Sequence, residues 1–382
     1  MAEAVRGKAV TVREPGKFQV EDLTFAAPGP GQVRVKIHAC GLCHSDVSFM
    51  SGKIPHPMPM VLGHEGAGTL EALGPGLSSG PGAWKVGDRV VLTLVSPCGR
   101  GHMCKAGRPA LCTGRGATFP MGSITSPEGT NFFPCTALGC MAEYAVVSAN
   151  AIVKVGDDTP LEKGALVSCG VTTGVGAAMN RAKVHPGSIC CVVGCGGVGL
   201  NTIQGCRICG AGQIIAVDTL PSKLQAARRF GATHTVNAKE VGSVIKEVQK
   251  LTGGGADYSF EVIGFPETAK QAYDAARPGG TTVLVGVPKP TDTIPISPTD
   301  MIIKEKILTG SFMGSNVPSI EVPLLLSLYK KGDLLLDELV SRYYPITEAR
   351  AAFDDLDSGS NLRGVFVMHD LLHLVGGSSS KL

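Results

Sequence analysis

The pattern of apolar and polar positions divides the chain into two regions of different texture. Through the first ~160 residues, short segments that alternate apolar and polar side chains lie between Gly- and Pro-rich turns, as in Gln32–Ile37. An alternation with a period of two is typical of strands that bury one face. The first region therefore predicts a β-rich domain of short strands and turns.

Beyond Gly187 the apolar runs become continuous and alternate with helical segments. The run Ser188–Val193 is followed by a Gly-rich turn and by a helical stretch over Gly199–Cys209. Continuous apolar strands separated by helices predict a parallel sheet that is covered by helices. The further strands predicted for this sheet are Gln213–Val217, Tyr258–Val262 and Thr282–Val285.

Beyond about residue 310 the chain is expected to return to the first domain. A helical segment over Val322–Lys331 precedes a final strand over Gly364–Met368. The predicted fold class is α/β, with a β-rich domain and a domain built on a doubly wound parallel sheet. The predicted boundaries are 1–170 for the first part, 171–312 for the second domain and 313–382 for the return.

Composition and charge limit the classes of partner. The chain has 382 residues, 43% apolar and 18% charged, which suits a globular protein of two domains. Its net charge is +3 without a clustered basic stripe, so neither nucleic acid nor a membrane is an expected partner. The N-terminus lacks the apolar segment of a secretory signal. The 13 Cys are therefore expected to be thiols and metal ligands rather than a disulfide framework.

A Gly-rich turn follows the first strand of the second domain. It fits the pattern G-x-G-x-x-G, it opens a helix, and Asp218 ends the next strand 19 residues beyond it. Asp218 is expected to accept hydrogen bonds from ribose hydroxyls and to repel a 2′-phosphate, which favours NAD over NADP. A purely structural turn is the alternative. The residues expected to approach the pyrophosphate are Gly194, Gly196, Gly197, Val198 and Gly199.

Cysteine and histidine positions predict a metal site in the first domain. Cys40 and Cys43 form a C-x-x-C pair, but no residues nearby complete a small zinc finger. Cys43 is followed by His64 and, much later, by Cys169. Two thiolates and one imidazole make a three-ligand zinc site that leaves a fourth position open for substrate. Cys43, His64 and Cys169 are therefore the predicted ligands of a catalytic zinc.

Four motifs occur together along the chain. They are G-x-C-x-S-D at 41–46, G-H-E at 63–65, C-G-x-x-T-G at 169–174 and V-G-x-G-G-V-G at 193–199. On these motifs the chain resembles the medium-chain zinc alcohol dehydrogenase family, from Val10 to near Met368. The resemblance implies a GroES-like catalytic domain and a Rossmann domain. It also implies reversible hydride transfer between an alcohol or aldehyde and NAD.

The same resemblance implies roles for individual residues. Glu65 would lie beside the zinc as an occasional fourth ligand, and Asp46 would hold the other nitrogen of His64 and fix its tautomer. Ser45 would take the proton of the alcohol hydroxyl. The residues implied to contact the cofactor are His44 and Arg363 at the pyrophosphate, Thr173 and Val285 at the nicotinamide, and Lys223 at the adenosine ribose.

The chain departs from the family at a second metal site. Relatives with a structural zinc carry four Cys with the spacing C-x2-C-x2-C-x7-C. Cys98, Cys104 and Cys112 keep three of these places, but Gly101 occupies the second. His102 is the expected replacement ligand of a structural zinc. Three ordinary thiols without a metal are the alternative.

A second departure concerns the proton relay. Many relatives end the relay at a His five residues after the first zinc-binding Cys, where this chain has Ser48. A hydroxyl is not a base near pH 7, so the proton is expected to leave through water or another group.

The resemblance also suggests a substrate class. Leu94, Ala137, Ile54 and Met313 occupy the positions that match the wall of the family's substrate pocket. Leu94 and Ala137 are smaller than the aromatic residues often found at their positions. The expected substrates are long-chain, aromatic or terpenoid alcohols and their aldehydes. S-(hydroxymethyl)glutathione is the alternative, although Ile54 offers no polar anchor for it. The long segment Thr113–Glu143 implies a homodimer.

Two other protein classes compete with this interpretation. One is a zinc-free member of the fold, either a quinone-reductase-like NADPH enzyme or a crystallin-like structural protein. The complete set of zinc ligands counts against it. The other is a zinc-storage or redox-sensing protein built on the 13 Cys, which the complete Gly-rich turn makes a poor explanation.

The last three residues, Ser380–Leu382, match the peroxisomal address. The preceding Gly376–Ser379 would present them on a flexible tail. The tripeptide predicts recognition by the peroxisomal import receptor and location in the peroxisome. An accidental tripeptide on a cytoplasmic protein is the alternative.

Overall fold

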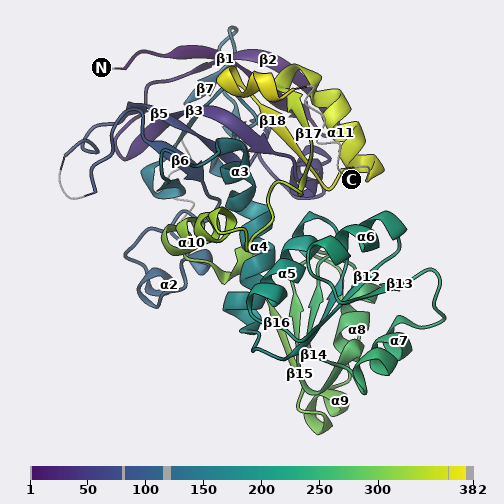
Figure 1. Cartoon of the computed structure of the whole chain (residues 1–382). Helices are drawn as coiled ribbons and strands as arrows, with labels where there is room; N and C mark the ends of the chain where they lie inside the picture. The colour runs from purple at the N-terminus through teal and green to yellow at the C-terminus, as the bar shows by residue number, and fades with distance from the viewer. Residues whose placement is uncertain (1, 80–81, 115–121, 360, 376–382) are drawn as a thin grey trace. The chain divides into compact units, whose positions relative to one another are not determined.

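The computed structural model describes residues 2–79, 82–114, 122–359 and 361–375. Ser380–Leu382 and part of Thr113–Glu143 lie outside these residues. Contacts divide the chain into two units, which are described separately (Figure 1). The boundaries expected from the sequence fall after residues 170 and 312, and the contacts divide the chain after Cys169 and Asn316. Unit 1 comprises Met1–Cys169, Val317–Gly332 and Leu336–Leu382, and unit 2 comprises Gly170–Asn316 and Asp333–Leu335.

Unit 1 is rich in short strands, as the sequence predicts. These strands are β1 (Val5–Glu14), β2 (Lys17–Phe25), β3 (Gln32–Gly41), β4 (Met60–Val61), β5 (Gly66–Leu73), β6 (Arg89–Leu92), β7 (Ile124–Thr125), β8 (Phe133–Pro134), β9 (Tyr144–Ser148), β10 (Ile152–Lys154), β17 (Val340–Pro345) and β18 (Arg363–Val367). Within the described residues they form one sheet in the order β7-β2-β1-β4-β8. A second sheet has the order β10-β6-β5-β3-β18-β17, and β9 also pairs with β3.

Strand β3 carries the centre of the larger sheet. The sequence predicts a strand over Gln32–Ile37, which the structure confirms and extends to Gly41. Residues 37–41 are all buried. A strand that is covered on both faces does not alternate polar and apolar side chains. The alternating pattern in the sequence therefore ended at Ile37, before the end of β3. The buried side chains of β3 pack with those of β1 and β18 in an apolar cluster of unit 1.

Unit 2 contains a parallel sheet of strands β11 (Ile189–Val193), β12 (Gln213–Asp218), β13 (His234–Asn237), β14 (Ala256–Glu261), β15 (Ala276–Leu284) and β16 (Ile307–Gly310). Their spatial order is β13-β12-β11-β14-β15-β16, and every pair is parallel. This is the doubly wound order 3-2-1-4-5-6, which reverses at β11. The predicted parallel sheet is therefore confirmed.

Helices connect these strands, as Figure 1 shows for unit 2. Helix α5 packs on β11 and β12, and α8 packs on β11, β14 and β15. The helices are α1 (His44–Met50), α2 (His102–Lys105), α3 (Leu161–Leu166), α4 (Thr172–Gly176), α5 (Gly197–Ile208), α6 (Pro221–Arg229), α7 (Val244–Thr252), α8 (Pro266–Ala275), α9 (Pro298–Ile303), α10 (Pro318–Lys330) and α11 (Ala349–Ser358).

Helix α10 begins earlier than the sequence predicts. The predicted segment is Val322–Lys331, whereas the helix begins at Pro318 and contains Pro323. A proline is well tolerated at the first helical position, because its missing N–H has no intrahelical acceptor there. Pro318 occupies that position. Pro323 lies one residue after the predicted start, so the turn that precedes it was not recognised as part of the helix.

Within the described ranges, no helix is both long enough and apolar enough to span a membrane.

Candidate metal centre and nucleotide site

Four buried side chains of unit 1 converge on one point. Cys43 directly precedes α1, and His64 and Glu65 lie in the turn between β4 and β5. Cys169 lies in a wider helical turn, Val167–Val171, that continues α3. One donor atom from each of the four lies within 4.8 Å of every other. The structure thus brings together the three ligands predicted from the sequence, and Glu65 with them.

Two glycines leave room for this cluster. Gly63 adopts φ +100°, and a side chain there would overlap the main chain of Met141. A Cβ atom on Gly41 would overlap the carboxylate of Glu65. The Gly residues of the G-x-C and G-H-E motifs are therefore steric requirements of the site.

Asp46 orients the imidazole of His64. The Oδ1 atom of Asp46 lies 3.0 Å from Nδ1 of His64 and accepts the Gly63 N–H at 3.2 Å. Asp46 is fully buried in the first turn of α1. A carboxylate at Nδ1 favours the tautomer with the proton on that nitrogen, so Nε2 keeps its lone pair for a metal. The contact expected between these two residues is present.

Arg363 lies at the metal cluster. One of its terminal nitrogens donates a hydrogen bond to Oε2 of Glu65, and both side chains are buried. The resemblance implies that Arg363 contacts the cofactor pyrophosphate. The structure shows in addition that its guanidinium is paired with Glu65, a contact that sequence reasoning missed because 298 residues separate the two.

Burial and mutual contacts shift the pKa values of the clustered side chains. Its hydrogen bond with Cys169, together with the nearby His64, holds the pKa of the Cys43 thiol well below its usual value. The same hydrogen bond and burial raise the pKa of Cys169 well above its usual value. Burial raises the pKa of Glu65 to about 7, against the opposing charge of Arg363. A bound divalent cation would stabilise both sulfurs as thiolates, which are the form in which Cys binds a metal.

The donor set fits Zn²⁺. Two sulfurs, one imidazole nitrogen and a carboxylate within a few ångströms suit the short bonds and low coordination number of zinc. Oε1 of Glu65 and Oδ2 of Asp46 are buried without a hydrogen-bond partner among the described residues. Cys43 and Cys169 are both free thiols. The residues present are therefore those that a catalytic zinc requires.

A second group of thiols lies elsewhere in unit 1. The sulfurs of Cys98, Cys104 and Cys112 lie within 4.8 Å of one another. His102 begins helix α2, its side chain is exposed, and it does not belong to this group. The three sulfurs thus converge without His102, whose role as a fourth ligand stays a prediction.

The nucleotide turn has the geometry that its pattern predicts. Helix α5 begins at Gly197, so the first N–H groups of the helix lie at the turn. A Cβ atom on Gly199 would overlap the carbonyl oxygen of Gly194, whereas one on Gly196 would meet nothing within 4 Å. Gly199 thus permits close packing, and Gly196 leaves open space that a phosphate can approach.

Asp218 lies at the carboxyl end of β12 and organises this turn. Its Oδ2 accepts the Cys195 N–H at 2.8 Å. Its Oδ1 accepts the N–H groups of Thr219 and Leu220 at 2.7 and 3.0 Å. A carboxylate has about four acceptor positions. Asp218 therefore joins the Gly-rich turn to the next loop and retains capacity for a ribose hydroxyl.

Glu261 is a functional candidate that sequence reasoning missed. It ends β14, is buried, and its Oε1 accepts the N–H groups of Ile263 and Gly264 at 2.9 and 2.7 Å. Side-chain atoms of Ile263 lie where a Cβ atom on Gly194 would be. Glu261 therefore holds the loop that packs against the nucleotide turn. In the sequence, the signal that could have identified Glu261 was a single acidic residue at the end of a predicted strand of the parallel sheet.

The remaining predicted site residues are described here by their element and exposure, unit by unit. His44 is exposed, and Ser45 and Ser48 are half-buried, on helix α1 of unit 1. In unit 2 Lys223 is half-buried on α6, and Val285 is buried directly after β15. The Thr173 hydroxyl, also in unit 2, lies 3.8 Å from the sulfur of Met313.

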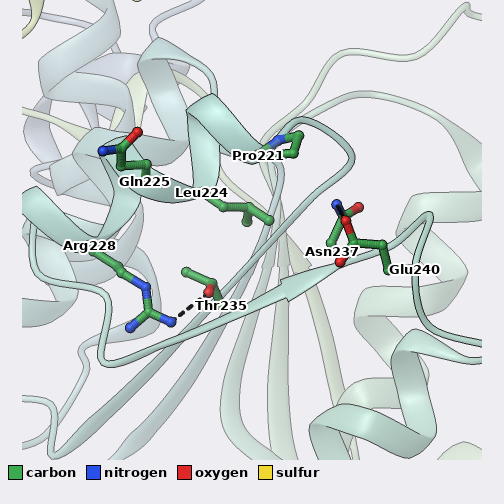
Figure 2. A pocket seen from close by; sticks show the side chains of 7 residues that line it. All are labelled: Pro221, Leu224, Gln225, Arg228, Thr235, Asn237 and Glu240. Atoms are coloured by element: carbon green, nitrogen blue, oxygen red, sulfur yellow. Dashed lines mark hydrogen bonds between the residues drawn. The ribbon is translucent and has the colours of Figure 1, made fainter. Parts of the chain in front are cut away.

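A surface cavity of about 330 Å³ lies between α6 and β13 of unit 2 (Figure 2). Its lining includes Arg228, which donates to Thr235 at 2.9 Å, and Asn237, which donates to Glu240 at 2.6 Å. These polar groups satisfy one another. None of the residues of the Gly-rich turn lines this cavity.

A doubly wound sheet with a Gly-rich turn, together with a buried Cys–His–Cys site, defines the class of zinc-dependent, nucleotide-linked dehydrogenases. Comparison with protein families agrees with this assignment. Residues 29–157 match the alcohol dehydrogenase GroES-like domain, and residues 197–331 match the zinc-binding dehydrogenase family.

Individual relatives support the same family. The chain is 36% identical over 381 residues to an alcohol dehydrogenase class-3 of Drosophila melanogaster, covering 95% of this chain and 99% of the relative. Benzyl alcohol dehydrogenase from Acinetobacter calcoaceticus is 33% identical, with a TM-score of 0.88 and coverage of 96% and 100%. An alcohol dehydrogenase zinc-binding domain protein from Burkholderia ambifaria is 34% identical, with a TM-score of 0.91 and the same coverage. The chain belongs to the zinc-dependent medium-chain alcohol dehydrogenase family and is an oxidoreductase that acts on alcohols.

The metal centre yields a first prediction. Cys43→Ser is expected to lower the zinc content by one ion per chain and to reduce alcohol oxidation to background, because a hydroxyl is a poor zinc ligand. The fold should be largely kept, as judged by circular dichroism. Metal analysis and steady-state turnover of the purified variant check this. Cys40→Ala is the matched control, since Cys40 lies outside the cluster, and it should keep both zinc and activity. Near-normal turnover of a zinc-depleted Cys43→Ser protein would contradict the assignment.

Proposed function

We propose that the chain is an NAD-dependent alcohol dehydrogenase that interconverts bulky apolar alcohols with their aldehydes or ketones. The observation that carries this proposal is the buried cluster of Cys43, His64 and Cys169 with Glu65 beside it. Three protein ligands leave one coordination position for the substrate oxygen. The reaction removes a hydride from the alcohol carbon and a proton from its hydroxyl, and it yields a carbonyl compound, NADH and H⁺.

The chain's own residues divide the work of this reaction. Zinc held by the cluster would polarise the substrate oxygen, and the nicotinamide would accept the hydride. Asp46 keeps the proton of His64 on Nδ1 and so keeps Nε2 available. Arg363 balances the charge of Glu65 in the dry site. Ser45 takes the hydroxyl proton, and Ser48 offers no titratable group to store it, so the proton leaves through water.

The choice of NAD rests on Asp218. Its carboxylate ends β12, where the adenosine ribose binds in doubly wound folds. Three backbone N–H groups hold it in place, so it does not turn away from a 2′-phosphate without breaking those hydrogen bonds. A fixed negative charge at this point favours the free 2′-hydroxyl of NAD.

The proposed substrate class rests on side-chain size. Leu94, Ala137 and Ile54 are half-buried apolar residues of unit 1, and none is aromatic or charged. Small apolar walls suit an extended or aromatic alcohol. The similarity to a benzyl alcohol dehydrogenase over nearly the whole chain also supports this class.

We also propose a homodimer. Strand β16 is an edge of the sheet in unit 2, and Ile307 on it is 53% exposed. Ile302 and Ile303 of the preceding helix α9 are each 75% exposed. An apolar sheet edge is an unfavourable surface for a monomer, and pairing with a second copy would cover it.

The substrate class is tested with a panel of alcohols. With NAD, benzyl alcohol and 1-octanol are expected to exceed ethanol in kcat/KM by at least about tenfold, since each buried methylene contributes about 0.8 kcal/mol. The Cys43→Ser protein serves as the blank. A kcat/KM for ethanol equal to that for benzyl alcohol and 1-octanol would argue against a large apolar substrate pocket. Absence of oxidation of every alcohol with either nucleotide would argue against the proposed activity itself.

Asp218 supplies a second test. Asp218→Asn removes the charge and keeps one oxygen acceptor, and Asp218→Ala removes both. Both variants are expected to shift the ratio of kcat/KM for NAD to that for NADP toward NADP by about tenfold or more, a change of about 1.4 kcal/mol. The Ala variant should lower the melting temperature more than the Asn variant, because it leaves three backbone N–H groups unpaired, whereas the remaining oxygen of Asn can still accept from Thr219 and Leu220. An unchanged cofactor ratio in both variants would contradict the role of Asp218.

We propose that Ser380–Leu382 directs the protein to the peroxisome. A fluorescent protein fused to the N-terminus should give a punctate signal that overlaps a peroxisomal marker. Deletion of Leu382 should make the signal diffuse, because the import receptor binds the terminal carboxylate of this tripeptide. A diffuse signal from the intact chain would reject the proposal.

A further inference from the structure

The hydroxyl of Ser311 is a buried polar group of unit 2 that has no hydrogen-bond partner among the described residues. Ser311 directly follows β16, and it is 8% exposed. A serine hydroxyl can donate one hydrogen bond and accept two. Burial of such a group without a partner is unfavourable, and most buried polar side chains have one. The orphaned hydroxyl therefore indicates a ligand that supplies the partner.

Ser311 lies at the carboxyl edge of the parallel sheet. The ends of β14, β15 and β16 are in register, with Glu261 beside Leu284 and Leu284 beside Gly310. The Ser311 N–H donates to the carbonyl of Leu284 at 2.9 Å. Ligands of doubly wound folds bind outside the carboxyl ends of the strands. The orphaned hydroxyl is therefore at the edge of the sheet that binds the nucleotide.

The order of the strands gives the direction of the cofactor along this edge. Asp218 ends β12, on one side of the Gly-rich turn that follows β11, whereas β14, β15 and β16 lie on the other side. The adenosine ribose binds at the acidic residue, and the pyrophosphate binds at the turn. The half of the dinucleotide that carries the nicotinamide therefore extends toward β14, β15 and β16. Ser311 lies on that side.

The neighbours of Ser311 belong to the same region of unit 2. Ser311 is hydrogen-bonded to Leu284, the residue before Val285, and it lies two residues before Met313. The sulfur of Met313 lies 3.8 Å from the Thr173 hydroxyl. The family resemblance implies that Val285 and Thr173 contact the nicotinamide. Ser311 thus lies between two segments that are implied to reach the same ring.

The side chain of Ser311 shares a face with that of Thr309. Alternate residues of an extended segment point to the same side. The Thr309 hydroxyl accepts a hydrogen bond from Arg181. Arg181 belongs to the helical segment Ala177–Ala182, which directly follows α4, and Thr173 lies on α4. The Ser311 hydroxyl is therefore directed toward the helical side of the sheet, where Thr173 also lies.

We propose that the Ser311 hydroxyl hydrogen-bonds the carboxamide of the nicotinamide and fixes the rotation of that ring. An amide carries both a donor and an acceptor, so it can pair with a hydroxyl in either role. With the carboxamide held, the ring presents a fixed face of its hydride-accepting carbon to the substrate. The contact depends on the proposed use of NAD, and it involves a residue to which neither the motifs nor the resemblance assigns a role.

Ligand binding to the full-length protein tests this contact. The two ligands are NADH and ADP-ribose, which lacks the nicotinamide, and their dissociation constants are measured by titration calorimetry without substrate. Ser311→Ala is expected to weaken the binding of NADH by about three- to tenfold, which is the usual effect of one hydrogen bond between uncharged groups. The binding of ADP-ribose should be the same as in wild type.

Ser259→Ala is the matched control. Ser259 is also a buried serine of this sheet, but its hydroxyl is paired with that of Thr282 at 2.8 Å. Ser259→Ala should lower the melting temperature and leave both dissociation constants unchanged. Ser311→Ala removes a hydroxyl that no described residue pairs with, so the melting temperature of the nucleotide-free protein should not fall.

Two results would overturn the proposed contact alone. One is unchanged NADH binding by Ser311→Ala when wild type binds both ligands, which would leave the proposed use of NAD intact. The other is an equal loss of affinity for NADH and ADP-ribose, which would show a general disturbance of the nucleotide site. A wild type that binds neither ligand would reject the proposed use of NAD, and the contact with it.

Discussion

Several ionisable side chains share one buried volume in unit 1, and their charges must be balanced there. Burial of an unpaired charge costs several kcal/mol, so each group needs a partner or a change of protonation. The carboxylate of Asp46 pairs with His64, and that of Glu65 pairs with Arg363. The two thiols pair with each other, with opposite shifts in their pKa values. A divalent cation held by the two sulfurs and His64 would add to this set of charges, and its contribution is to the chemistry of the site more than to the fold.

This constraint explains much of the local structure around the site. The last residue of β3 must be glycine, because any side chain at position 41 would displace the Glu65 carboxylate. Gly63 must bend the chain between β4 and β5, so that Asp46 accepts its N–H while also orienting His64. Glu65 is paired with the first residue of β18, near the C-terminal end of the chain. The site is therefore assembled from segments at both ends of unit 1, and each segment contributes a geometric condition in addition to a ligand.

The nucleotide turn and the second group of thiols depend on backbone groups instead. At the turn, the N–H groups near the start of α5 and the carboxylates of Asp218 and Glu261 hold the loops without a metal. Among the three thiols of Cys98, Cys104 and Cys112, backbone N–H groups donate to the sulfurs of Cys98 and Cys112. Glycine matters in all three places for different reasons. It permits close packing at Gly199, leaves approach space at Gly196, and withholds a ligand at Gly101.

The sequence alone determined the fold class, the parallel sheet and the candidate ligands Cys43, His64 and Cys169, which the structure brings together. Strand periodicity and short motifs are local properties, so β11, α5 and β12 were predictable to within a few residues. Only the tertiary structure decided which polar groups meet. The pairing of Glu65 with Arg363 and the loop held by Glu261 both depend on distance and direction. Sequence spacing does not encode these quantities, because they arise when segments far apart in the chain pack around shared buried charge.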